Sequence, residues 1–439
     1  MKKIINISLI LLMSLGFSSC NDFLDIEPEG KVIPKNLEEN RALITTAYNT
    51  FPVHKSYTAF RSDELILDSS TDDTPFFKDF YLWNDTNPDP ISYEYPWLQF
   101  YTTIFYSNHI INEAVKTIKD SEEKNQLIGE AYALRAYSYF DLVNLYGKPY
   151  AIETSGQDKG VPIVLITDLE QVLSPSPVAD VYEQVLADIQ KAKELININT
   201  QQIGKNYRFS KNALYTLEAR VSLYMNNWEK ALQSVNKALT YNETLTDFNV
   251  ESTLPNQYNS VESILALEEV FGYKINNASF ISTDLIDSYD RVNDLRFDLY
   301  FVSDGDNYKA KKGGSQDFIC SMRTSELFLI KAEALLNLDQ LEASKTTLLS
   351  LLKKRYATNY HSTLSAEIQS LNEVEYTQRL LEERRKELAL EGHRWFDLRR
   401  TNQKEINHTY DGTVYTLEQN DPRYTIQYPR SAKLNNPNL

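Results

Sequence analysis

The sequence predicts a mostly α-helical protein, built on tetratricopeptide-like helix pairs and interrupted by irregular, partly β insertions. Three observations support this prediction: long stretches in which apolar residues recur at steps of three and four, a weak internal repeat, and two long segments without a clean period. The 439 residues are enough to bury a substantial core. Aromatic residues are abundant, with 29 Tyr, 19 Phe and 4 Trp, and most of these rings are expected in that core.

Residues 1–19 have the features of a secretory signal peptide. Lys2 and Lys3 form a short basic start, and an apolar stretch over 4–17 follows. This stretch is shorter than the roughly 20 residues that a transmembrane helix needs. Cys20 comes directly after two serines, as in a bacterial lipobox. We therefore expect Cys20 to be diacylated and to become the mature N-terminus; the alternative is an ordinary secreted protein cut near the same point.

The charge of the chain excludes several kinds of partner. The formal net charge is -16, and loss of the signal peptide removes two lysines and no acid, so the mature chain is more negative still. A chain of this charge repels phosphate backbones, so we expect no nucleic-acid partner. Membrane attachment would depend on the lipid, whose two acyl chains suit stable anchoring. With Cys20 lipidated, Cys320 has no disulfide partner and is expected as a small core residue.

A tether and a first helix are predicted after the lipid site. Residues 20–36 are acidic and punctuated by Pro and Gly, as expected of a lipidated tether. A helix is predicted over 37–49, where Asn36 and Glu39 have the spacing of a capping box. The segment 51–96 is aromatic, rich in Asp and full of turn residues. It is predicted to be an irregular functional insertion with short strands.

Helical periodicity is clean over 97–118, 123–145 and 181–196. In each of these stretches, apolar residues recur at the steps that place them on one helix face. Gly147 follows the second stretch as a C-cap. A connection that contains several prolines, 150–177, separates the second stretch from the third.

A weak internal repeat predicts paired helices. The chain reads Ala-Leu-Tyr-Thr-Leu-Glu-Ala-Arg at 213–220 and Leu-Phe-Leu-Ile-Lys-Ala-Glu-Ala at 327–334. Small residues such as Ala219 and Ala332 let two helices approach closely, as in tetratricopeptide pairs; a generic helical bundle is the alternative. Between the two copies lies a second irregular insertion, 242–322, with strand-like pieces at 264–270 and 299–302.

Aromatic side chains of the two insertions are the candidate ligand-binding residues. Trp83 and Tyr81 lie outside any clean helix and, two positions apart in an extended segment, would point the same way. Such rings stack on the apolar C–H faces of sugars, while their polar edges meet hydroxyl groups. Phe76 and Phe77 in the first insertion and Tyr273 in the second are further candidates. The alternative for each ring is packing of the insertion against the helical body.

No catalytic or metal-binding motif is visible in the sequence. The five histidines have no metal-ligand spacing such as His-Glu-x-x-His, and neither a nucleophile elbow nor a phosphate-binding glycine loop is present. We therefore predict a protein that is not an enzyme and requires no cofactor. Asp68, Asp72, Asp73 and Asp79 lack the regular spacing of a calcium loop, so a solvated acidic loop is favoured over a calcium site.

Residues 382–400 read Glu-Glu-Arg-Arg-Lys-Glu-Leu-Ala-Leu-Glu-Gly-His-Arg-Trp-Phe-Asp-Leu-Arg-Arg. This run strongly resembles the C-terminal signature of the SusD/RagB family of nutrient-binding outer-membrane lipoproteins. Within it, Glu383 and Arg384 are better explained by a structural ion-pair network than by an acid–base pair. Further matches follow the chain in order, at 21–25, 97–108, 130–147, 294–296, 421–424 and 436–439.

The resemblance implies a single SusD-like α-helical domain over 37–439, in which the insertions at about 51–96 and 242–322 carry the ligand site. It implies a non-enzymatic lipoprotein on the cell-surface side of the outer membrane. Such a protein would bind a nutrient oligosaccharide and deliver it to a TonB-dependent (SusC-like) transporter. Two alternatives are an oligopeptide-binding RagB-like lipoprotein and a helical-repeat scaffold that binds other proteins.

Overall fold

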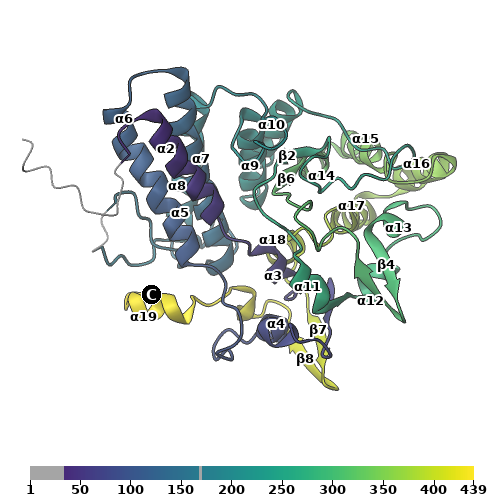
Figure 1. The fold of residues 1–439 in the computed structure, drawn as a ribbon. Helices are drawn as coiled ribbons and strands as arrows, with labels where there is room; N and C mark the ends of the chain where they lie inside the picture. Colours follow the sequence, from purple (N-terminus) through teal and green to yellow (C-terminus); the bar gives the residue numbers. More distant parts are fainter. Residues whose placement is uncertain (1–33, 168–170) are drawn as a thin grey trace, which may run out of the picture.

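The computed structural model describes residues 34–167 and 171–439. The signal peptide, Cys20 and most of the predicted tether therefore lie outside the described residues. Within the described ranges the chain is mostly helical with a few short strands (Figure 1), which confirms the predicted fold class. None of the helices in these ranges is both long enough and apolar enough to cross a membrane.

The N-terminal helices pack together as a bundle (Figure 1). Asn36 caps the first of them by accepting a hydrogen bond from the Glu39 N–H at 3.0 Å. The Glu39 carboxylate accepts from the Lys35 N–H instead of the Asn36 N–H, so only half of the predicted capping box forms. A π-helical turn interrupts the helix predicted over 97–118. The helices are α2 (Leu37–Thr50), α5 (Leu98–His109), η2 (Ile110–Ala114), α6 (Val115–Thr117), α7 (Glu122–Tyr146) and α8 (Val178–Leu195).

Two helix pairs follow this bundle, as the repeat predicts. Helix α10 packs between its own partner α9 and the next pair, so the pairs form a continuous stack. Ala219 and Ala332 are both fully buried at these contacts. The Ser344 hydroxyl donates to the Ala332 carbonyl at 2.5 Å, which brings the second pair into close contact. The pairs are α9 (Lys211–Tyr224) with α10 (Trp228–Leu239), and α14 (Thr324–Asn337) with α15 (Leu341–Leu352).

Enlarging Ala332 should overpack this contact. We expect Ala332→Phe to lower the free energy of unfolding by about 1–3 kcal/mol, because the extra ring has no space at a fully buried position. Ala343→Phe is the matched control, since Ala343 is exposed on α15. Thermal or urea denaturation measures both variants, and equal midpoints for the two would show that the register of the helix pair is wrong.

The two insertions meet in a small sheet, which the sequence did not reveal. Strand β1 (Leu65–Leu67) of the first insertion pairs antiparallel with β3 (Ser279–Ile281) of the second. Backbone hydrogen bonds from Asp68 to Ala278 and from Ser282 to Glu64 extend this pairing on both sides. The remaining elements of the insertions are α3 (Lys55–Ala59), α4 (Thr74–Tyr81), β2 (Ser263–Leu265), α11 (Tyr273–Asn277), α12 (Thr283–Asp287), α13 (Arg296–Tyr300), β4 (Phe301–Asp304), β5 (Asn307–Ala310) and β6 (Met322–Arg323).

The C-terminal part returns to the insertions after a further group of helices (Figure 1). The signature run is not one helix, because it turns sharply at Leu390 (φ 64°) and Gly392 (φ 75°). A Cβ at Gly392 would lie 2.2 Å from the Lys55 Cβ, so the turn requires glycine for both its backbone conformation and its close approach to α3. The elements are η3 (Thr358–Tyr360), α16 (His361–Ser370), α17 (Glu373–Glu387), α18 (Arg394–Arg400), β7 (Ile406–Tyr410), β8 (Thr413–Leu417), η4 (Pro422–Tyr424) and α19 (Arg430–Asn435).

The glutamates of the signature form a buried ion-pair network, as predicted. Most of their partners, however, are arginines from elements distant in the sequence, and fewer are residues one turn away on the same helix. Arg323 donates to Glu387 and Glu391, each at 2.8 Å. Arg355 also donates to Glu387, at 2.9 Å, and the side chains of these four residues are at most 2% exposed. The network therefore joins the signature to β6 and to the segment that follows α15.

Candidate functional site

Trp83 and Tyr81 are buried, and the segment that carries them is not extended. Helix α4 continues to Tyr81, and Trp83 adopts a left-handed backbone conformation (φ 52°), so the prediction of an extended segment is wrong. The two rings stack on opposite sides of the His408 imidazole, with centroid distances of 4.0 and 4.3 Å. The Trp83 Nε1–H donates to the Arg61 carbonyl at 3.0 Å. Both rings therefore pack the insertion against the rest of the protein, as in the alternative given above. They could reach a ligand only after a local rearrangement.

The other predicted aromatic residues differ in exposure. Phe77 is 1% exposed and stacks on Phe60, so it belongs to the core. Phe76, one position earlier, is partly exposed. Tyr273 at the start of α11 is 70% exposed. Of the five candidates, Phe76 and Tyr273 are therefore the ones that a ligand can reach directly.

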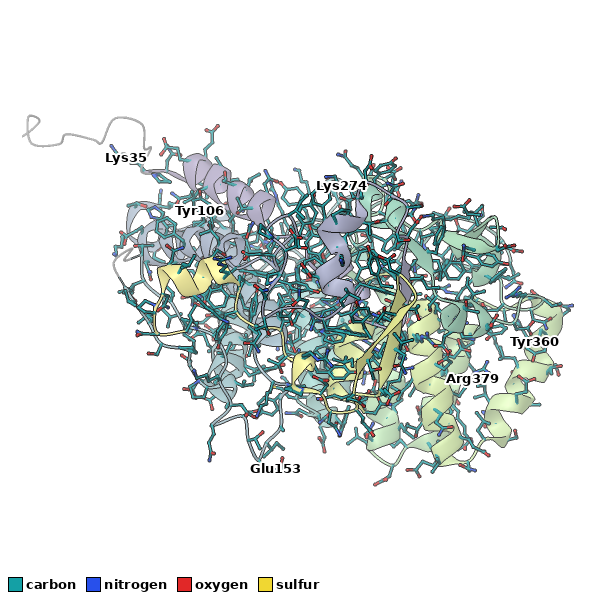
Figure 2. The ribbon with its side chains drawn as sticks, turned by 90° about the horizontal axis from the view of Figure 1, so that it is seen from below. Lys35, Tyr106, Glu153, Lys274, Tyr360 and Arg379 are labelled. Carbon is teal, nitrogen blue, oxygen red and sulfur yellow. The ribbon has the colours of Figure 1, made fainter. Side chains whose placement is uncertain are left out.

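The structure brings Phe76 and the start of α11 together through Tyr93. The rings of Phe76 and Tyr93 are stacked, with centroids 5.0 Å apart and planes 13° from parallel. The Lys274 ammonium donates to the Tyr93 hydroxyl at 3.1 Å and lies 5.1 Å from the Phe76 ring centre. Figure 2 shows Lys274 toward one edge of the molecule, and its side chain is exposed. This cluster joins the two insertions at the surface.

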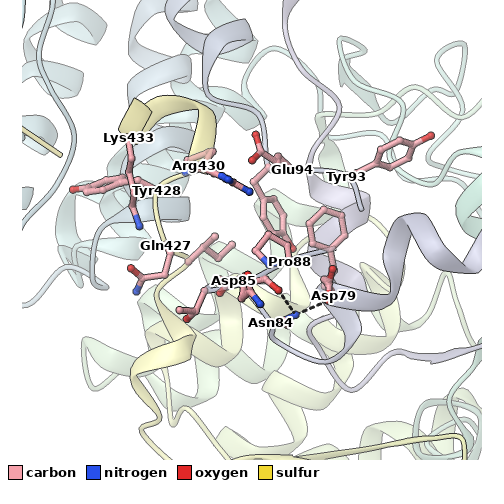
Figure 3. A pocket seen from close by; sticks show the side chains of 16 residues that line it. Asp79, Asn84, Asp85, Pro88, Tyr93, Glu94, Gln427, Tyr428, Arg430 and Lys433 are labelled. Carbon is pink, nitrogen blue, oxygen red and sulfur yellow. Dashed lines mark hydrogen bonds between the residues drawn. The ribbon is translucent and has the colours of Figure 1, made fainter. Parts of the chain in front are cut away.

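Two hollows flank Tyr93 and Glu94, and we call the surface that they form the Tyr93 groove. The first hollow, about 340 Å³, lies between the segment 79–95 and the C-terminal segment 426–433 (Figure 3). The second, about 570 Å³, lies between 49–57 and the start of α5. Both volumes are in the range of small-molecule binding sites. Tyr93 and Glu94 line both hollows, so the two hollows are neighbours on the surface.

The walls of the first hollow are fixed by carboxylates that face into the protein. Asp79 accepts hydrogen bonds from the Asn84 side chain (2.8 Å), the Asp89 N–H (2.7 Å) and the Ser92 hydroxyl (2.6 Å). These hydrogen bonds hold the loop 84–92 against the C-terminal part of α4. The Asp85 carboxylate receives two hydrogen bonds from the fully buried Arg61 guanidinium, at 2.7 and 3.0 Å. These hydrogen bonds fix the loop that forms one wall of the hollow.

Sequence reasoning missed most of the residues that line this groove. Tyr93 and Glu94 belong to the first insertion, but only the first aromatic run of that insertion was singled out. Arg430 and Lys433 lie more than 330 positions further along the chain, and no local pattern associates them with it. A usable signal was the aromatic-rich run Tyr-Glu-Tyr-Pro-Trp over 93–97, which follows a turn with two prolines.

A second cluster of titratable groups lies in the core. Among the described residues, His54, Asp141 and Glu268 form the one group with the composition of a metal site. The Lys55 ammonium lies 2.5 Å from Glu268 and 3.6 Å from Asp141, and the Tyr137 hydroxyl also donates to Glu268, at 2.6 Å. Burial opposes ionisation of Glu268, but Lys55 and then His54 hold its pKa below the ordinary value. The lysine therefore supplies the positive charge that a metal would bring, and the cluster ties α3 to α7.

The four aspartates considered for calcium do not converge. Asp68 accepts from the Ser70 N–H and hydroxyl, and Asp73 accepts from the Asn277 side chain at 2.8 Å. The Asp79 carboxylate accepts the three hydrogen bonds from its own loop described above, and Asp72 is exposed. These side chains stabilise local turns and the junction between the insertions.

Comparison with known protein families gives two matches. A family model described as "Starch-binding associating with outer membrane" matches residues 22–223. The model of the SusD family matches residues 271–438. The two models cover both helical parts, the first insertion and most of the second, so the match extends over the fold that builds the groove.

Individual relatives agree with these matches. The SusD-like protein P38 of Formosa agariphila is 25% identical, over 92% of each chain. A SusD superfamily protein from Bacteroides thetaiotaomicron has a similar structure, with a TM-score of 0.76, 23% identity and coverage of 92% of this chain and 98% of that one. A laminarin-binding SusD-like protein has a TM-score of 0.62 at 18% identity, over 84% and 92% of the two chains.

Proposed function

Since the chain belongs to the SusD/RagB family, we propose that it is a lipid-anchored, surface-exposed protein of the outer membrane that captures a nutrient oligosaccharide in the Tyr93 groove. It then delivers this oligosaccharide to a TonB-dependent transporter. It binds and releases its ligand without chemical change.

The observation that carries this proposal is the chemistry of the Tyr93 groove. Tyr93 lines both hollows, and the partly exposed Phe76 stacks on its ring, so the two rings provide an aromatic surface at the groove. Sugar rings have apolar C–H faces that pack against such surfaces. The amide side chains of Asn84, Asn87 and Gln427 line the first hollow and suit hydroxyl groups. Aromatic faces next to neutral amides favour a carbohydrate over a purely apolar ligand.

The family relatives add support for a glycan ligand. One matching family model describes starch binding in association with the outer membrane, and one structural relative is described as binding laminarin. Both descriptions concern other proteins, and the side chains of this groove determine which glycan this chain binds. Membership in the family supports a role beside a TonB-dependent transporter.

A binding screen tests the proposal directly. We expect the purified mature protein to bind members of a glycan array and to ignore a library of oligopeptides. Bound glycans should be recovered without new reducing ends after hours of incubation. Peptide binding without glycan binding would favour the RagB-like alternative, and release of reducing sugar by a pure sample would overturn the non-enzymatic role.

The aromatic pair should contribute strongly to binding. We expect Phe76→Ala to weaken the affinity for the best array glycan by about tenfold to a hundredfold, by analogy with the roughly 1–3 kcal/mol lost with one stacking ring. Calorimetric titration measures this loss. The matched control is Tyr241→Ala, which removes a ring that stacks on Tyr215 and lines neither hollow of the groove. A Phe76→Ala protein that is folded and binds like the wild type would remove the aromatic pair from the site.

A further inference from the structure

Exposed cations line the first hollow of the Tyr93 groove. Arg430 and Lys433 lie three positions apart on α19, on the same side of this short helix. Within the part of the chain that the structure describes, neither side chain has a carboxylate within 4.0 Å. Figure 3 shows both on the side of the hollow opposite Asn84 and Asp85. Their N–H groups are therefore available to a ligand.

The carboxylates of the same hollow are less available. Asp79 is buried and accepts three hydrogen bonds from its own loop, and Asp85 is held by Arg61. Glu94 is exposed, and one of its oxygens accepts from the Ser431 hydroxyl at 2.8 Å. The groups that a ligand meets in this hollow are thus two cations, neutral amides and a single open carboxylate.

A third cation lies at the other end of the aromatic pair. The Lys274 ammonium contacts the Tyr93 hydroxyl and leaves its remaining N–H groups exposed. Cations on both sides of Tyr93 contrast with the chain as a whole, whose net charge is -16. In such a chain, Arg430 and Lys433 are informative because both line the same hollow and neither forms an ion pair among the described residues.

On this basis, and given the proposed function, we infer that the oligosaccharide carries anionic groups, carboxylates or sulfate esters, which Arg430 and Lys433 bind while the sugar rings contact the aromatic pair. Guanidinium and ammonium groups form charge-assisted hydrogen bonds with either anion. The Glu94 carboxylate, which lines the same hollow, repels an anionic group placed next to it and accepts hydrogen bonds from the hydroxyl groups of the ligand.

Matched glycans test this inference. The array should contain uronate oligosaccharides with their methyl-esterified forms, and sulfated oligosaccharides with their desulfated forms. We expect the wild-type protein to prefer an anionic member of a pair, and the two kinds of pair distinguish carboxylate from sulfate recognition. Preferred binding should weaken as the salt concentration rises.

Variants of the full mature chain test whether the first hollow is responsible for the preference for anionic glycans. The double variant Arg430→Gln/Lys433→Gln should lose roughly tenfold in affinity for the anionic glycan and keep its affinity for the neutral form. Glu94→Gln should bind the anionic glycan more tightly. Lys353→Gln is the control and should bind like the wild type, because this exposed lysine directly follows α15 and lines neither hollow.

Three results would overturn the inference, and they are distinguishable. Equal binding of neutral and anionic forms would refute anion recognition and leave the proposed function intact. An anion preference that the double variant retains would show that these two cations are not responsible. Failure to bind any glycan would refute the proposed function itself.

Discussion

Replacing Glu387 with Gln should lower the free energy of unfolding by about 3–5 kcal/mol, because it removes one charge from a buried ion-pair network. Glu387 accepts hydrogen bonds from Arg323 and Arg355, and Arg296 lies 3.4 Å away. Gln keeps the shape of the side chain but removes one of the carboxylates that compensate these buried guanidinium groups, which leaves an excess of positive charge in the core. Denaturant titration monitored by circular dichroism measures the loss.

The control is Glu382→Gln on the same helix. The Glu382 side chain is 38% exposed and lies 3.8 Å from Arg385, so its loss should change stability by less than about 1 kcal/mol. If Glu387→Gln gives no soluble protein, proteolysis of the two variants in cell extracts compares their folding. Equal stability of both variants would contradict a structural role for the network.

The destabilisation should depend on pH. Burial opposes ionisation of Glu387, but Arg355 and Arg323 hold its pKa well below the ordinary value. A carboxylate with a depressed pKa stabilises the folded state above its unfolded pKa, about 4.3, and loses this contribution as the pH falls toward its folded pKa. The difference in stability between wild type and Glu387→Gln should therefore be constant above about pH 5 and shrink progressively below it.

Cys20→Ala should release the protein from the membrane. None of the described helices is long and apolar enough to span a bilayer, so the proposed lipid would attach the protein to the membrane. Its two acyl chains give stable anchoring, and the surface of this acidic protein is not expected to replace it. Metabolic labelling with a fatty acid and fractionation of cells measure lipidation and location. We expect the variant to carry no label and to appear in the soluble fraction.

Cys320→Ala is the control for this experiment, because Cys320 is the other cysteine of the chain and is buried. This variant should keep both the label and the membrane location. Label on the Cys20→Ala protein would show that the lipid is attached elsewhere.

The helical body was predictable because its signals are local. The helix predicted over 123–145 is observed as α7, 122–146, and Ser121 caps it by accepting from the Lys124 N–H. Periodicity and caps depend on residues within one or two turns of each other. The packing of α9 against α10 and of α14 against α15 likewise confirms the pairing that the repeat indicated.

The insertions were harder to predict because their structure depends on distant contacts. Nothing near Leu65 indicates that it pairs with Ile281, more than two hundred positions away. Trp83 and Tyr81 have the composition of an exposed aromatic surface, yet His408 from β7 fills the space between them. The C-terminal segment 426–433 forms one wall of the groove. The sequences of the two insertions could therefore indicate Phe76 and Tyr273 but not Arg430.

A crystal structure of the mature protein with the best array oligosaccharide tests the central claim most directly. We predict sugar rings in the Tyr93 groove, with one ring against the pair Phe76 and Tyr93 and the chain continuing into the hollow beside Arg430. The main competing surface is the hollow of about 780 Å³ between the start of α2 and the segment 197–208. A glycan bound there, with the Tyr93 groove empty, would contradict the account.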